Sequence, residues 1–129
     1  MIVAKAVLLE LNKLLKLNAS GNEQDWDIEL ADYKRVTEFI DIAYSANLSL
    51  PERYAIVQLI LASYDDYITN KGNDEEIWRG IIKVLDAHFE LYVDTLNYWA
   101  LAHETTINSI FEITPQVRAY LASKNDFFI

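Results

Sequence analysis

The sequence predicts an all-α protein, a single-domain helical bundle over residues 1–129 with about five to six helices around a central apolar helix at 50–68. Three observations support this prediction. The chain has only three glycines and two prolines, too few for the many turns of a β-sandwich or barrel. Hydrophobic residues make up 52% of its 129 residues, enough to bury a core in one domain. It has no cysteine, so neither disulfides nor thiol ligands are expected to hold it together.

The first two helices are predicted from apolar side chains that recur with helical spacing. Over 2–17 this face consists of Val3, Val7, Leu11, Leu14 and Leu15. Gly21 then lies in a polar stretch that is expected to end the helix. A second helix is predicted over 27–46, with an apolar face formed by Leu30, Tyr33, Val36, Ile40 and Ala43.

The central helix has the clearest start signal. Ser49 and Glu52 have the spacing of a capping box, in which each side chain bonds to the other residue's backbone N–H. The segment Tyr54–Ala62 that follows is apolar nearly all round, as expected for a helix that the others surround. Asn73 and Glu76 repeat the cap pattern and predict the start of the next helix.

The remaining chain predicts further helices. No proline occurs in residues 74–103, which therefore form either one long helix or two with a break near 87–90, and the break is the favoured alternative. A last helix is predicted over 114–123, since Thr114 is a good N-cap and Pro115 suits the first helical position.

The net charge of −9 is unevenly distributed. Between positions 23 and 112, eighteen acidic residues against six basic ones give a net charge of −12. Such a field repels nucleic-acid phosphates and anionic lipid, so we expect no binding to nucleic acid or membrane. It would attract a basic protein. The alternative is that the charge only keeps the protein soluble. Glu10 and Lys13 interrupt the N-terminal apolar run before it reaches the length of a signal peptide, and we expect a cytoplasmic protein.

No constellation in the sequence predicts catalysis. Asp86 and Glu90 share a helix face, but His88 points away from both, which indicates a solvated surface and not a metal site. No serine lies in a Gly-x-Ser-x-Gly setting, and no glycine-rich loop could hold phosphate. We therefore predict no catalytic, cofactor-binding or metal-binding residues, and no small-molecule substrate.

A surface signal remains where the central helix ends and the next begins. If these two helices are antiparallel neighbours, carboxylates and large aromatic rings meet at one end of the molecule. Carboxylates steer a basic partner, and Tyr and Trp supply the anchors of an interface. The predicted partner-binding residues are Asp65, Asp66, Tyr67, Asp74, Glu75, Glu76 and Trp78. The alternative is that Trp78 belongs to the core and the acids only solvate helix ends. A second acidic candidate consists of Glu23, Asp25, Trp26, Asp27 and Glu29.

Several segments in the C-terminal two-thirds of the chain carry a family resemblance. They are Leu50-Pro51-Glu52-Arg53-Tyr54, Tyr64-Asp65-Asp66, Trp78, Asn97-Tyr98-Trp99 and Phe111-Glu112-Ile113-Thr114-Pro115-Gln116-Val117-Arg118. In these segments the chain resembles the small, acidic, all-α immunity proteins of bacterial toxin–immunity pairs, including contact-dependent growth inhibition systems. The resemblance implies a cytoplasmic, non-enzymatic inhibitor that masks a cognate toxin domain, commonly a basic nuclease. It implies no particular contact residues.

Two other classes of function stay open at this point. One is a non-catalytic helical adaptor or regulatory subunit that forms a homo-oligomer through an apolar face. The other is an enzyme with an unrecognised helical site, which a metal or small ligand would stabilise against heat.

Overall fold

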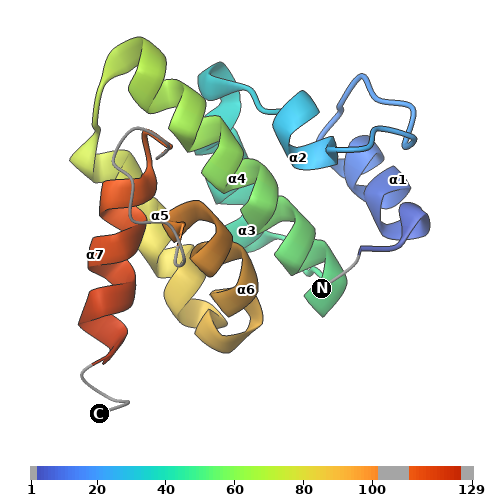
Figure 1. Cartoon of the computed structure of the whole chain (residues 1–129). Helices are drawn as coiled ribbons and strands as arrows, with labels where there is room; N and C mark the ends of the chain where they lie inside the picture. Colours follow the sequence, from blue (N-terminus) through green and yellow to red (C-terminus); the bar gives the residue numbers. More distant parts are fainter. Residues whose placement is uncertain (1–2, 102–110, 126–129) are drawn as a thin grey trace.

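The computed structural model describes residues 3–101 and 111–125, and every regular element in these ranges is a helix (Figure 1). The elements are α1 (Lys5–Leu14), α2 (Trp26–Glu29), the short 3₁₀ helix η1 (Tyr33–Arg35), α3 (Val36–Ser45), α4 (Leu50–Lys71), α5 (Glu75–Ala87), α6 (Phe89–Ala100) and α7 (Thr114–Asn125). The predicted all-α bundle is confirmed. The described ranges hold seven α-helices, slightly more than the five to six expected.

The central position of α4 is also confirmed (Figure 1). This helix of 22 residues packs against α1, α2, α3, α5 and α6. Its residues from Tyr54 to Tyr64 are buried, apart from a half-buried Gln58. The predicted capping box is formed, since the Ser49 hydroxyl accepts a bond from the Glu52 N–H at 3.3 Å and the Ser49 N–H donates to the Glu52 carboxylate at 2.9 Å. An all-round apolar helix can bury every face only in the middle of a bundle.

The helix predicted over 27–46 is instead interrupted after α2. Asp32 caps η1, because its carboxylate accepts a hydrogen bond from the Lys34 N–H at 3.0 Å. The Asp32 N–H itself donates to the Ser63 hydroxyl on α4, at 3.0 Å. An aspartate that bonds local backbone groups competes with the helical ladder. The bond to α4 therefore sets the point where the chain leaves α2 and turns into α3.

The predicted break near 87–90 lies at His88, which separates α5 from α6. Its backbone angles, φ −146° and ψ 51°, are outside the helical region. α6 in turn supports α7. The Thr114 hydroxyl donates to the Trp99 carbonyl at 2.7 Å and accepts from the Phe111 N–H at 3.1 Å. Thr114, predicted as the N-cap, is the first residue of α7, and its hydroxyl ties this helix to the end of α6.

Candidate functional site

The turn between α4 and α5 is held by Asp74, not by Asn73 as the sequence pattern had predicted. Asp74 is the N-cap of α5, and its carboxylate accepts a hydrogen bond from the Ile77 N–H at 3.1 Å. The Tyr64 hydroxyl donates to the Asp74 carbonyl at 3.1 Å and accepts from the Asp74 N–H at 2.9 Å. The Tyr67 hydroxyl donates to the second carboxylate oxygen of Asp74 at 3.3 Å. Asp74 therefore uses both carboxylate oxygens to fix the ends of two helices.

The aromatic residues of the predicted site form a stack. Tyr64 lies between Tyr67 and Trp78, with ring centroids 5.9 Å apart in both pairs and interplanar angles of 20° and 17°. Tyr64 is fully buried and Trp78 is only 8% exposed, so both belong to the core. Tyr67 is half-buried at the edge of the stack. Of the two aromatic residues predicted as anchors, Tyr67 is the one that a partner can reach.

Asp65 and Asp66 lie on another side of α4. The Asp65 carboxylate accepts a hydrogen bond from the Ile113 N–H at 2.9 Å, at the start of α7. Burial raises the pKa of Asp65 above its ordinary value, although this hydrogen bond opposes the rise. Together with Asp66 it lines a small cavity of about 100 Å³ beside Trp99 and Phe111. Successive helical residues are about 100° apart around the axis, so this pair does not share a face with Tyr67.

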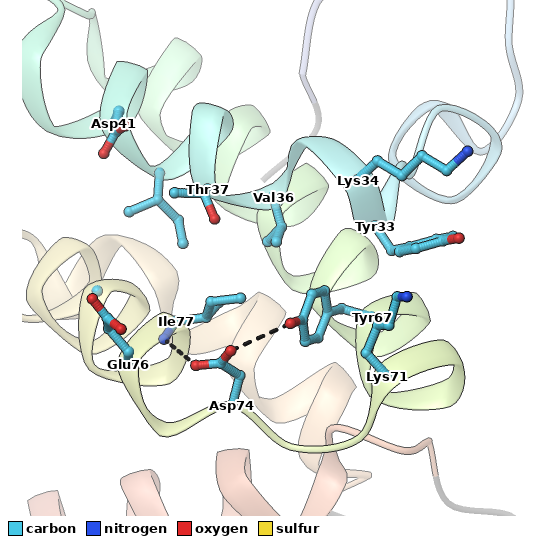
Figure 2. A pocket seen from close by; sticks show the side chains of 12 residues that line it. Tyr33, Lys34, Val36, Thr37, Asp41, Tyr67, Lys71, Asp74, Glu76 and Ile77 are labelled. Carbon is cyan, nitrogen blue, oxygen red and sulfur yellow. Dashed lines mark hydrogen bonds between the residues drawn. The ribbon is translucent and has the colours of Figure 1, made fainter.

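Three of the predicted residues, Tyr67, Asp74 and Glu76, line a groove of about 670 Å³ between α3, α4 and α5 (Figure 2). We refer to this as the α3–α5 groove. Glu75 is exposed beside it and does not line it. The complete lining consists of Tyr33, Lys34, Val36, Thr37, Ile40, Asp41, Tyr67, Lys71, Asp74, Glu76, Ile77 and Gly80.

The η1–α3 wall of this groove was not predicted from the sequence. Each long helix places a pair four residues apart on it: Thr37 and Asp41, Tyr67 and Lys71, Glu76 and Gly80. Residues four apart lie on one helix face, so these three faces could be identified from the sequence. The packing of α3 against α5 brings them together, and that contact is a tertiary fact that helical spacing alone does not supply.

The second acidic candidate is largely occupied by internal bonds. The Trp26 indole N–H donates to Asn12 at 2.9 Å and the ring is buried. Glu23 accepts from the Ser20 N–H at 2.7 Å, and Glu29 accepts from the Asp25 N–H at 2.9 Å. The remaining acids line a cavity of about 310 Å³ whose walls include Asp25, Asp27, Tyr54, Asp94 and Tyr98. Burial raises the pKa of Asp27 there.

Of the residues considered above for metal binding, Asp86 has a structural role in the docking of α7. Asp86 accepts a hydrogen bond from the Tyr120 hydroxyl at 2.6 Å and forms an ion pair with Lys124 at 2.9 Å. Desolvation alone would raise the pKa of Asp86, but these two partners hold it below its ordinary value. Within residues 3–101 and 111–125, no group of three or more His, Asp or Glu side chains is placed to share a metal ion.

Comparison with protein-family models, curated proteins and solved structures gives no match for this chain. None of the helices in the described ranges combines the length and the apolar character that crossing a lipid bilayer requires.

Proposed function

We propose that this protein is an immunity protein, a cytoplasmic and non-catalytic inhibitor that binds a cognate bacterial toxin domain and neutralises it by direct occlusion. The proposed partner is a basic domain, with a nuclease as the favoured class. Two observations support this proposal, the family resemblance of the sequence and the carboxylates that lie at one end of the bundle.

The observation that carries the proposal is a set of carboxylates without counter-ions beside the α3–α5 groove. Asp41, Glu75 and Glu76 are exposed, and none of them forms an ion pair within the described part of the chain. By contrast, Glu38 and Asp86 each pair with a basic side chain. Free carboxylates beside an accessible Tyr67 match the two components of a charged interface, steering groups and an aromatic anchor.

A nuclease active site must be cationic because it binds the phosphates of its substrate. An acidic protein can occlude such a site by presenting carboxylates where phosphates would lie. Tight one-to-one inhibition needs a rigid surface and a few anchors. The stacked rings and the two hydrogen bonds to the Asp74 carboxylate hold the α4–α5 turn rigid, and Tyr67 is the ring of the stack that a partner can reach.

Co-expression tests this proposal directly. We would express the protein with the C-terminal domain of the gene product encoded immediately upstream, purify through a tag on one partner, and score growth. The expected result is a one-to-one complex and restored growth. The complex should also associate more slowly at about 0.5 M than at about 0.1 M salt, because salt screens electrostatic steering.

Two outcomes would refute the proposal. One is an upstream domain that is harmless in the cell. The other is a toxic domain that this protein neither binds nor neutralises. If the purified protein instead self-associates in a sizing experiment and binds no toxin, the homo-oligomeric adaptor becomes the better explanation.

A further inference from the structure

The α3–α5 groove has an apolar floor. Val36, Ile40 and Ile77 contribute side chains from two helices, and all three are buried or half-buried. Gly80 widens the floor because it has no side chain; a methyl group placed there would lie 3.4 Å from Ile40. The groove can therefore receive a side chain or a segment of another molecule without displacing a residue of the core.

The rim of the groove is charged, with opposite signs at its two ends. Figure 2 shows Asp41 and Glu76 on one side of the groove and Lys34 and Lys71 on the other. No acid of the groove forms an ion pair with either lysine among the described residues. The Lys34 ammonium lies 5.9 Å from the centroid of the Tyr33 ring, a contact that leaves its N–H donors for a ligand. Both ends thus retain charge that a partner can neutralise.

The separation of the two ends suits a polypeptide. Lys34 and Asp41 are seven positions apart along η1 and α3, which corresponds to about 10 Å along a helix axis. Two residues that are seven positions apart on a helix of the partner lie on one face of it and span the same distance, about 10 Å. One segment of a partner can therefore reach both ends while its intervening side chains cover the apolar floor.

Asp74 sets the shape of the groove and is not one of these free groups. Its carboxylate accepts hydrogen bonds from the Ile77 N–H and the Tyr67 hydroxyl. These two bonds fix the wall of the groove between its two charged ends. A wall that is ordered before binding lowers the entropy lost when a ligand docks.

We propose that the α3–α5 groove binds one segment of the basic partner, with a Lys or Arg side chain between Asp41 and Glu76 and an Asp or Glu side chain against Lys34 and Lys71. This inference rests on the proposed function and extends it, because it identifies the contact surface and the direction in which the bound segment runs. General attraction between an acidic protein and a basic toxin would require only the acidic end.

Charge reversal at the basic end separates these two explanations. The Lys71→Glu variant makes the protein more acidic, so general attraction predicts tighter binding to a basic domain. A groove that holds a partner carboxylate at Lys71 predicts binding weaker by about tenfold or more, because two carboxylates would then face each other. Lys83→Glu is the matched control, since Lys83 is exposed on α5 outside the groove. It should bind at least as tightly as the wild-type protein.

Two further pairs of variants test the acidic end and the floor. Glu76→Lys should weaken binding by about tenfold or more, whereas Glu90→Lys should not. Both glutamates are exposed and lie in the first turn of a helix, so reversal disturbs the helix dipole equally. Thr37→Trp should block the groove, whereas Ala122→Trp, at an exposed position on α7, should not.

The measurement is the dissociation constant of each variant for the purified, catalytically inactivated domain encoded upstream, with circular dichroism melting curves to verify the fold. The expected result is that Lys71→Glu, Glu76→Lys and Thr37→Trp weaken binding and their three controls do not. If the wild-type protein binds and all three variants bind as tightly, the groove assignment is wrong while the immunity function stands. If the wild-type protein does not bind, the proposed function fails and the groove assignment fails with it.

Discussion

The carboxylate of Asp65 accepts a hydrogen bond from the backbone N–H of Ile113, 2.9 Å away and 48 residues further along the chain. This bond joins the second half of α4 to Ile113, the residue directly before α7. Asp66, its neighbour in sequence, is exposed and makes no such side-chain bond to the described residues. Adjacent carboxylates of the same predicted patch therefore have different roles, since one holds the fold together and the other faces solvent.

Replacement of Asp65 by alanine should destabilise the protein. The change leaves the Ile113 N–H without its acceptor in a half-buried turn, which costs about 1–3 kcal/mol of unfolding free energy. Asp66→Ala is the control and should change it by no more than about 0.5 kcal/mol. Urea unfolding of the three proteins measures both values, and equal stability of the two variants would contradict this role of Asp65.

The Tyr64 hydroxyl is expected to matter more than that of Tyr67. Tyr64→Phe removes the partner of both the Asp74 N–H and the Asp74 carbonyl, at a fully buried position, and should cost about 1–3 kcal/mol. Tyr67→Phe loses one bond of 3.3 Å at the edge of the stack and should cost about 0.5 kcal/mol. Both variants keep the aromatic rings, so their thermal unfolding compares the hydroxyl groups alone. A larger loss for Tyr67→Phe would show that the α4–α5 turn is held differently.

Local signals predicted much of the fold, and non-local contacts account for what they missed. The capping box at Ser49 and the apolar circumference of the central helix are properties of neighbouring residues, and both are formed. The break at His88 was likewise predicted within a range of four positions. The interruption at Asp32 was not, because it depends on Ser63, 31 residues away.

For the candidate site too, the residues set by local sequence were predicted, and those set by contacts between distant helices were not. The sequence identified Tyr67, Asp74 and Glu76, which do meet in the groove, because the short turn between α4 and α5 forces their proximity. It grouped Asp65 with them although that carboxylate serves α7, and it missed Lys34 and the rest of the opposite wall. Which helix lies opposite the turn depends on how α3 packs against α5.

The contribution of Asp86 to stability should depend on pH. The pKa of the Asp86 carboxyl is lower in the folded protein than its ordinary value of 3.8. The ion pair with Lys124 therefore stabilises the protein fully at pH values above 3.8. This stabilisation is lost as the pH falls through the lower pKa of the folded state. Asp86→Asn should therefore cost about 0.2–1 kcal/mol at neutral pH, the size of a partly exposed ion pair.

The test is urea unfolding of wild-type protein and Asp86→Asn at neutral pH and at about pH 3. The difference between the two proteins should shrink at the lower pH. Asp41→Asn is a control at an exposed position in the middle of α3, without an ion pair among the described residues, and it should differ little from wild type at neutral pH. A difference for Asp86→Asn that grows on acidification would mean that the carboxylate does not support α7 through Lys124.

Two glycines near the groove should respond to alanine in opposite directions. Gly72, between α4 and α5, has φ 85° and ψ −179°, a backbone region that only glycine occupies readily. Gly72→Ala should therefore cost about 1–3 kcal/mol through strain alone, because no atom lies within 4 Å of the added methyl group. Gly80 lies inside α5, and its added methyl group would touch Ile40 at 3.4 Å, the edge of ordinary contact.

Gly80→Ala should stabilise the protein by about 0.5–1 kcal/mol, because glycine inside a helix loses more backbone entropy on folding than alanine does. Melting curves of the two variants give the signs directly. A loss of stability in Gly80→Ala would mean that α3 and α5 are too close at Ile40 to accept a methyl group, and that the floor of the groove is full. Stability unchanged in Gly72→Ala would mean that the turn adopts another backbone conformation, and Asp74 would then no longer be held between Tyr67 and α5 as the groove requires.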